Sequence, residues 1–357
     1  MEMKYVLNFN EIDKNFLNTV GGKNASLGEM IKAGIRVPPG FAVTTECYLD
    51  FITETGLKKR IFDILEKMDA KDLSSIDAGS EEIQHLFMET EIPDNMRSTI
   101  KDAYFGLCEM CQVDAVPAAV RSSATAEDLP TASFAGQQDT YLWVMGANNI
   151  VEDVKRCWAS LFASRAISYR LNNNFSHEKV LISVGIQKMV HAKAAGVMFT
   201  LNPINGDISK VVIEGSWGLG ETVVSGSVTP DKFVVDKVIM EVNEKTISRK
   251  HIECVFDPDK SGVIDVDVDP DRQSKCCLEE REIMELVRTA KIIENHYGRP
   301  MDIEWSIDED LPFPDNVFVV QARPETVWSQ KKKESVIGKK SSHQLLMEQA
   351  MKRIKIK

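Results

Sequence analysis

The order of strand-like and helix-like segments is the sequence feature that most constrains how this chain can fold. Apolar segments typical of strands occur at residues 118–123, 180–190, 195–200, 210–215, 301–306 and 317–324. Segments with apolar residues at helical spacing occur at 46–112, 151–172 and 278–297. Because the two kinds interleave without a regular strand–helix–strand period, the sequence favours an α+β fold over a doubly wound parallel sheet.

Three local features predict individual turns, loops and hairpins. The paired glycines at the start of 21–28 predict a turn that leads into a short amphipathic helix near Leu27 and Met30. The polar stretch 69–80 predicts a loop within the helical region. Residues 231–241 and 244–255 alternate in polarity, which predicts a hairpin.

The two last strand-like segments carry the clearest chemical signal. A period of two places Asp302 and Glu304 on one face of the first segment, and Gln321 and Arg323 on one face of the second. If the strands are neighbours, one surface displays two carboxylates, an amide oxygen and a guanidinium. Hard oxygen ligands suit Mg²⁺, and a fixed guanidinium suits phosphate oxygens. A surface ladder of salt bridges is the alternative reading of each strand alone.

Two further cations lie where backbone and side chain can approach an anion together. Lys23 follows paired glycines, and Arg121 ends an apolar strand just before a loop rich in small and hydroxyl residues that runs to Tyr141. We expect residues 121–141 to form a lid over phosphates, with a plain solvent loop as the alternative. Position 17 is leucine, so the Lys23 segment is not a Walker A loop.

The remaining motifs suggest one adenine contact and argue against zinc, metalloprotease and serine-hydrolase sites. Gln187 ends a buried strand whose edge can contact an adenine ring, although an ordinary buried strand explains it equally well. Cys108 and Cys111 form one C-x-x-C pair, but the next cysteine pair is far away in the sequence, so a zinc site is not expected. The sequence contains neither an H-E-x-x-H nor a G-x-S-x-G motif.

Composition and charge limit the expected partners and the cellular location of the protein. The net charge of −11 argues against a nucleic-acid partner, and no apolar run approaches the roughly 18 residues that span a membrane. The N-terminus lacks an apolar signal segment, and seven cysteines do not form a disulfide framework, which predicts a cytoplasmic location. Residues 329–357 are expected to form a basic tail or linker, since nine Lys or Arg but two Glu occur from residue 331 onward.

Long motifs in a fixed order resemble the phosphoenolpyruvate synthase and pyruvate phosphate dikinase family. They are Gly-Gly-Lys-Asn-Ala-Ser-Leu-Gly-Glu-Met at 21–30, Val-Pro-Pro-Gly-Phe at 37–41, Ala-Val-Arg-Ser-Ser-Ala-Thr-Ala-Glu-Asp at 119–128, Phe-Ala-Gly-Gln at 134–137, Gly-Leu-Gly-Glu at 218–221, Asp-Ile-Glu-Trp at 302–305 and Gln-Ala-Arg-Pro-Glu-Thr at 321–326. The resemblance implies an ATP-grasp fold, in which two α+β lobes clamp ATP. The expected lobes are 1–190, with a helical insertion at about 46–112 and the lid at about 121–141, and 191–328.

The resemblance also implies roles for individual residues. Lys23, Arg121 and Arg323 match the family's phosphate-contacting cations, which act in catalysis. ATP contacts are implied for the phosphate-covering loop and the adenine side, at Gly136, Thr140, Tyr141 and Gln187. Glu304 and Gln321 match the Mg²⁺ ligands, with Asp302 nearby.

A departure from the family pattern concerns the phosphoryl acceptor. Family members carry a phosphohistidine in a glycine-rich motif, whereas His343 lacks both the glycines and the following alanine. We therefore expect a separate partner subunit to carry this histidine and the acceptor site. In the implied reaction, ATP gives its β,γ-pyrophosphoryl group to the histidine, which yields AMP and phosphate.

Within the family, phenylphosphate synthase resembles a phosphoenolpyruvate synthase divided into subunits, so phenol is an expected final acceptor. The alternatives are an N-terminal fragment of a phosphoenolpyruvate synthase or of an antibiotic phosphotransferase. A third is a module that senses ATP without chemistry.

Overall fold

The computed structural model describes residues 5–125, 128–129, 132–133, 140–173, 175–258 and 262–328. The chain divides into two compact units, Met1–Pro324 and Glu325–Lys357, and everything that follows concerns the first unless stated. In the described part of the second unit, the Glu325 carboxylate accepts hydrogen bonds from the backbone N–H groups of Val327 and Trp328. The predicted tail at 329–357 lies outside the described residues.

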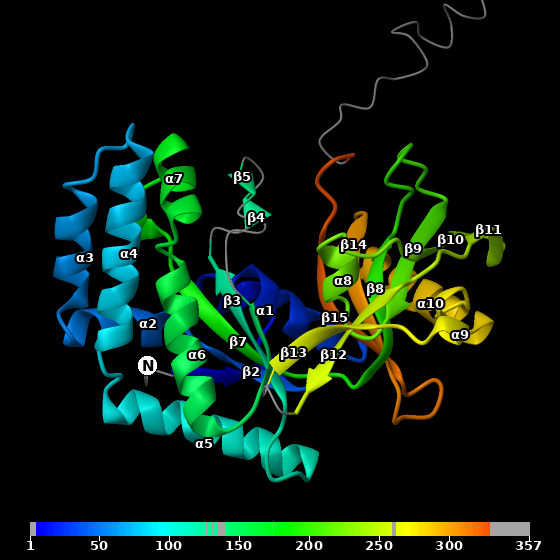
Figure 1. Ribbon diagram of the computed structural model, residues 1–357, viewed down its shortest axis with the longest axis horizontal. Coiled ribbons are helices and arrows are strands. Elements are labelled where there is room, and N and C mark those ends of the chain that lie inside the picture. Colours follow the sequence, from blue (N-terminus) through cyan, green and yellow to red (C-terminus); the bar gives the residue numbers. More distant parts are fainter. Residues whose placement is uncertain are drawn as a thin grey trace, which may run out of the picture. The chain divides into compact units, whose positions relative to one another are not determined.

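Two antiparallel sheets organise the first unit (Figure 1). The first sheet has the order β1 (Val6–Asn8), β2 (Gly40–Val43), β7 (Ile182–Lys188), β3 (Ala118–Ala124) and β6 (Thr140–Val144). The second has the order β11 (Glu241–Thr246), β10 (Asp231–Asp236), β9 (Lys210–Trp217), β8 (Ala192–Phe199), β14 (Met301–Asp308) and β15 (Val317–Pro324). Two small hairpins are β4 (Asp128–Leu129) with β5 (Ala132–Ser133), and β12 (Ile252–Asp257) with β13 (Gly262–Asp267).

Helices occupy the connections between these strands. They are α1 (Leu17–Lys32), α2 (Thr45–Glu54), α3 (Leu57–Leu65), α4 (Leu73–Glu89), α5 (Asp94–Cys111), α6 (Ala147–Ser160), α7 (Ser164–Asn172), α8 (Glu221–Val224), α9 (Pro270–Gln273) and α10 (Glu280–Tyr297). Three 3₁₀ turns lie at Phe9–Glu11, Lys14–Phe16 and His177–Lys179. Within the described ranges, no helix combines the length and the apolar character needed to cross a membrane.

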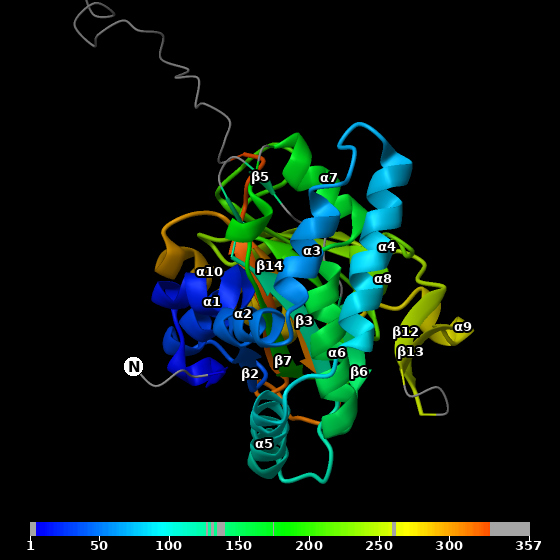
Figure 2. The ribbon, with the colours of Figure 1, turned by 90° about the vertical axis from the view of Figure 1, so that its left-hand side faces the viewer.

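Each sheet has its own hydrophobic core. Helix α6 packs on β3 and β7, and α4 contacts both α6 and α7, so a helical layer covers one face of the first sheet; Figure 2 shows this layer in front. At its centre the rings of Phe51 and Trp158 stack with their centroids 4.9 Å apart. Helix α10 packs on β14 of the second sheet, and α1 contacts strands of both sheets. The α+β class predicted from the sequence is confirmed.

The strand register also confirms the predicted pairing of the last two strands, whereas four other details differ from the expectations. The chain leaves the first sheet at the end of β7, residue 188, and enters the second at the start of β8, residue 192. The proposed boundary between lobes at residue 190 stays a prediction. The expected loop at 69–80 is wrong from Leu73 onward, because Asp72 caps the start of α4 and Ile76 packs into the core.

The other differences concern element boundaries. The expected helix at 151–172 is two helices, α6 and α7, interrupted at residues 161–163. The expected hairpin at 231–255 is formed by β10 and β11 alone, and β12 pairs with β13 instead. The helix predicted near Leu27 and Met30 is present, but it is longer than expected, because residues 22–28 already belong to α1, whose helical geometry breaks at Gly21.

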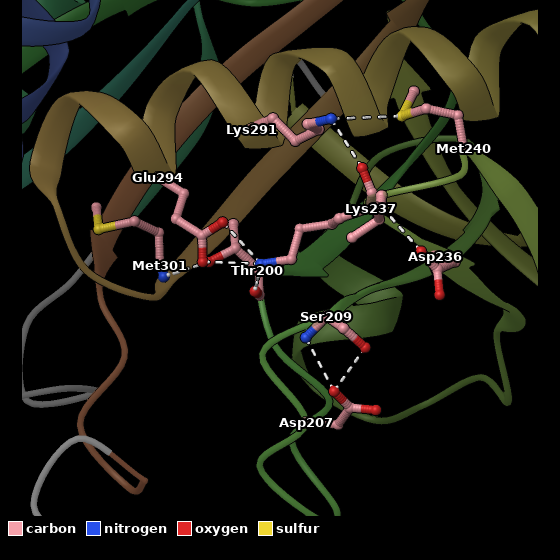
Figure 3. Close-up of polar contacts among 10 residues, drawn as sticks. Thr200, Asp207, Ser209, Asp236, Lys237, Met240, Lys291, Glu294 and Met301 are labelled. Carbon is pink, nitrogen blue, oxygen red and sulfur yellow. Dashed lines mark hydrogen bonds and ion pairs between the residues drawn. The ribbon is translucent and has the colours of Figure 1, made fainter.

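A polar network holds the start of β14 in place (Figure 3). Lys237, in the turn after β10, donates hydrogen bonds to the carbonyl oxygen of Thr200 and to the carboxylate of Glu294 on α10. The Thr200 hydroxyl in turn accepts a hydrogen bond of 2.8 Å from the backbone N–H of Met301, the first residue of β14. The network therefore joins β8, β10 and α10 at the strand end that carries Asp302.

His177 and Arg170 form a partly buried contact that predicts a pH dependence of stability. Arg170, which is 1% exposed, donates a hydrogen bond of 2.8 Å from Nε to the Nδ1 of His177. Burial of the ring, and then the charge of Arg170, lower the pKa of His177 to about 4. The ordinary histidine pKa is about 6.5, so the unfolded chain binds this proton at a higher pH than the folded chain does. The stabilisation is complete above about pH 6.5 and is lost as the pH falls toward 4.

We expect His177→Gln, whose side-chain oxygen can still accept the Arg170 hydrogen bond, to remove this part of the pH dependence. Denaturant unfolding at pH 7 and at pH 4.5 measures it, and the free energy of unfolding of the wild-type chain should fall by roughly 1–2 kcal/mol more than that of the variant. An equal fall in both chains would contradict the assignment.

Candidate functional site

The break in α1 brings Lys23 against the first sheet. Gly21 has φ +72°, and a β-carbon at this position would lie 2.1 Å from the carbonyl oxygen of Ser123 on β3. Only glycine allows this close approach with a positive φ. Just after the break, the Lys23 ammonium donates a hydrogen bond of 3.3 Å to the Ser122 carbonyl oxygen. The helix is therefore fixed where its lysine meets the end of β3.

The Arg121 guanidinium connects the two sheets. From β3 of the first sheet, its Nη2 donates to Glu304 Oε2 at 3.0 Å and to Gln321 Oε1 at 2.8 Å, and both acceptors lie on the second sheet. Its Nη1 donates to the Val320 carbonyl oxygen at 3.1 Å. The planar fork of arginine suits such multiple contacts. Nε of Arg121 has no partner within the described part of the chain.

The last two strands present their polar residues in directly opposed pairs. Asp302 is opposite Arg323, and Glu304 is opposite Gln321. Arg323 donates from Nε to Asp302 Oδ2 at 2.8 Å, so these two side chains form an ion pair at the strand ends. Arg323 is 46% exposed, whereas Asp302 is 16% exposed. The sequence prediction that four functional groups meet on two neighbouring strands agrees with this geometry.

These groups line one pocket of about 310 Å³, which lies within the usual range of small-molecule sites of roughly 300–1,000 Å³. Its charged and amide-bearing residues are Lys23, Arg121, Gln187, Lys188, Glu221, Glu304, Gln321 and Arg323. The apolar part comprises Ala119, Leu142, Met189, Val190, Leu219 and Val224. The pocket thus offers one charged region and one apolar region to the same ligand.

The two regions occupy opposite ends of the pocket. β7 continues from Gln187 into the link at residues 189–191, and β14 runs toward the same link, because the Glu309 N–H donates to the His191 carbonyl oxygen. Met189 and Val190 are part of this link, so the apolar end lies there. Arg323 lies opposite Asp302, near the other end of β14.

Not every predicted residue lies in this pocket. Thr140 lines it and pairs with Arg121, whereas its neighbour Tyr141 is not among the lining residues and lies under the guanidinium of Arg156, 5.9 Å from the ring centroid. Alternation along β6 explains the difference, since adjacent side chains point to opposite faces. The geometry therefore gives no support to a phosphate contact by Tyr141. Gly136 lies outside the described residues, as do residues 126–127, 130–131 and 134–139 of the predicted lid.

The oxygen donors of this site suit a magnesium ion that substrate phosphates also coordinate, rather than a metal ion held by protein ligands alone. Among the described residues, no group of three or more His, Cys, Asp or Glu side chains could hold a metal. Glu304 and Gln321 nevertheless offer hard oxygens within one pocket. Asp302 lies two residues before Glu304 on β14, in the pair with Arg323, and is not among the lining residues. Mg²⁺ is commonly bound by one or two carboxylates together with substrate phosphates and water. These residues could hold it only when a phosphate ligand completes the coordination.

Comparison with known proteins identifies the family. Residues 17–344 match the family described as "Pyruvate phosphate dikinase, AMP/ATP-binding domain". The chain belongs to this family. Among its relatives, a probable phosphoenolpyruvate synthase of Staphylothermus marinus is 48% identical over 95% of the chain, which covers 43% of that protein. The phosphoenolpyruvate synthase of Aeropyrum pernix is 46% identical over 94% of the chain, which covers 44% of that protein.

A third relative, a probable phosphoenolpyruvate synthase of Methanocaldococcus jannaschii, is 47% identical over 93% of the chain, which covers 27% of that protein. The chain thus spans less than half the length of these relatives. Membership of the family confirms the resemblance on which the residue assignments rest, while the individual roles stay predictions.

Several lining residues were not singled out from the sequence as candidate site residues, among them the polar residues Lys188, Glu221 and Ser306. Glu221 lies in the Gly-Leu-Gly-Glu segment, and Ser306 lies two positions after Glu304. The period of two that marked Asp302 and Glu304 continues to Ser306, so the signal was present, but a lone serine carries little chemical information.

The close approach at Gly21 predicts a large destabilisation by Gly21→Ala. Alanine in the left-handed region costs roughly 1–2 kcal/mol, and the clash with Ser123 adds to it, so the total should be at least about 3 kcal/mol. Gly34→Ala is the matched control, since Gly34 has φ +78° with no atom within 4 Å of a built β-carbon. Its cost should stay at roughly 1–2 kcal/mol. Equal losses in thermal unfolding would show that the Ser123 contact does not matter.

Proposed function

We propose that this chain is the ATP-binding, pyrophosphoryl-donating part of a phosphoenolpyruvate synthase-type phosphotransferase, with the ATP-grasp fold of that family. The observation that carries the proposal is the two-ended pocket. Its charged end contains Lys23, Arg121 and Arg323, which match the three anionic groups of a triphosphate, and its apolar end can take a flat base. The match to an AMP/ATP-binding domain supports the same ligand.

The proposed mechanism depends on charge neutralisation. Phosphoryl transfer needs little covalent chemistry from the protein, so positioned cations supply most of the catalysis. Lys23, Arg121 and Arg323 bind the phosphate oxygens, and Glu304 and Gln321, with Asp302 beside them, would hold Mg²⁺. When bound, the ion would neutralise further charge on the phosphates.

The reaction is assigned from the family. A histidine nitrogen of the remaining polypeptide attacks the β-phosphorus of ATP, the bond from this phosphorus to the oxygen of the α-phosphate breaks, and AMP leaves. Hydrolysis then removes the γ-phosphoryl group as phosphate and leaves a phosphohistidine. The wall of the pocket keeps ATP in one orientation for this attack.

The final acceptor follows from the relatives rather than from the pocket. The three relatives reported above carry the name phosphoenolpyruvate synthase, which supports pyruvate as acceptor over phenol. We propose that the remaining polypeptide, whether on the same chain or on a partner subunit, carries the phosphohistidine. An assay with that polypeptide, ATP and either pyruvate or phenol distinguishes the acceptors by the product formed.

A charge-removing substitution tests the role of the metal-ligand pair. Glu304→Gln keeps the side-chain shape, and we expect AMP formation in the presence of the histidine-bearing polypeptide to fall by roughly 10²–10³-fold, the usual cost of losing one preorganised electrostatic group. Glu285→Gln is the control, because Glu285 pairs with Arg288 on the exposed side of α10 and does not line the pocket. Its activity should equal that of the wild-type chain.

The outcomes separate the alternatives. Normal activity of Glu304→Gln would refute the role of this carboxylate. Binding of ATP by the wild-type chain without AMP formation in the presence of any histidine-bearing polypeptide would favour a nucleotide-sensing module. Failure of the wild-type chain to bind ATP in calorimetry would refute the proposed function as a whole.

A further inference from the structure

Ser306 is a buried polar residue in the pocket that neither the mechanism nor the sequence analysis uses. It lies on β14, is 4% exposed and lines the pocket. Its hydroxyl has no hydrogen-bond partner within the described part of the chain. The residue directly opposite on β8 is Ala195, whose methyl group offers no polar atom. The hydroxyl is therefore enclosed by a wall that does not satisfy it.

An unsatisfied buried hydroxyl is costly, roughly 1–3 kcal/mol, and native proteins seldom leave one without a reason. A serine hydroxyl can donate one hydrogen bond and accept two, so it can meet either a donor or an acceptor. Because Ser306 faces the pocket, a ligand bound there can supply the missing partner. The hydroxyl is thus prepared for a polar atom of the ligand.

The position of Ser306 along β14 determines which part of a bound ligand it can contact. Residues two apart on a strand are about 7 Å apart, so Ser306 lies about 7 Å beyond Glu304 and farther still from Asp302. This displacement is toward the link at 189–191, where the apolar wall lies. Lys23, Arg121 and Arg323 lie at the charged end. A ligand whose phosphates meet these cations therefore presents its other end to Ser306.

Gln187, which lies between Arg121 and the link at 189–191, provides an independent observation. It is 3% exposed, lines the pocket, and its Nε2 has no partner among the described residues. Its Oε1 lies 3.5 Å from Nη1 of Arg121. One sheet thus contributes an unsatisfied amide N–H group and the other an unsatisfied hydroxyl, and Met189 and Val190 line the pocket beside them together with Lys188. A flat, nitrogen-rich base or a sugar hydroxyl has the complementary groups.

We infer that the Ser306 hydroxyl is a nucleoside-binding group, which hydrogen-bonds the base or the ribose of the bound nucleotide and does not contact its phosphates. This inference rests on the proposed function, since it assigns a part of the same ligand to a residue of the same pocket. It adds a recognition residue on the second sheet to the amide of Gln187 on the first.

Calorimetric titration with three probes tests this inference: ATP, adenosine and inorganic tripolyphosphate. One hydrogen bond is worth about 1 kcal/mol, which is about fivefold in affinity. Ser306→Ala should therefore bind ATP and adenosine about fivefold more weakly than the wild-type chain and bind tripolyphosphate equally well. Arg323→Ala should show the reverse pattern, with tripolyphosphate and ATP weakened and adenosine unchanged.

Ser216→Ala is the matched control. Ser216 is fully buried on β9 and lies opposite Ala195 in the same row of residues, and its hydroxyl also has no partner among the described residues, but it does not line the pocket. Its removal should leave the affinity for all three probes unchanged. A second pair, Ser306→Thr and Ser306→Val, differs only in one hydroxyl, so comparing the two removes any effect of side-chain shape.

Each outcome decides the inference. Equal adenosine affinity in Ser306→Ala and wild type, or in Ser306→Thr and Ser306→Val, would overturn it. Weaker tripolyphosphate binding by Ser306→Ala would overturn it too, because the hydroxyl would then act at the phosphates. If the wild-type chain binds neither ATP nor adenosine, the proposed function fails first, and that result is distinct from a loss confined to the Ser306 variants.

Discussion

The contact of the Arg121 guanidinium with Glu304 and Gln321 is the interaction on which the site depends. One side chain from the first sheet reaches a carboxylate and an amide on the second, at 3.0 and 2.8 Å. Its exposure is 18%, and that of Glu304 is 27%, so both charges are partly removed from water. A charge in such a position needs a partner, and here the partners lie on the other sheet. The contact therefore keeps the polar residues of both sheets together in the wall of one pocket.

Several parts of this arrangement could be predicted from the sequence because they follow from local periodicity. The alternation of Asp302 with Glu304, and of Gln321 with Arg323, depends only on the geometry of a strand. Their direct opposition in the register then needed one further assumption, that the strands are neighbours. The α+β class followed in the same way from the order of segments.

Other parts could not be predicted because they depend on contacts between distant segments. The break of α1 at Gly21 exists because Ser123, about one hundred residues away, occupies the space of a side chain. The face on which Tyr141 lies is set by the register of β6 against β3, which no local pattern specifies. The start of α4 at Leu73 follows from the burial of Ile76, so a polar composition hid a helix that tertiary packing stabilises.

The same arginine contact has a consequence for ligand binding under the proposed function. While Arg121 donates to Glu304 and Gln321, it occupies the oxygen atoms that Mg²⁺ would use, and its positive charge opposes a second cation beside them. A triphosphate offers the guanidinium stronger anionic acceptors and so releases these oxygens. Nucleotide and metal are then bound together more favourably than either is alone. The Arg121 charge that pairs with these oxygens would therefore also make metal binding dependent on the nucleotide, which fits a donor set with too few carboxylates to hold the ion unaided.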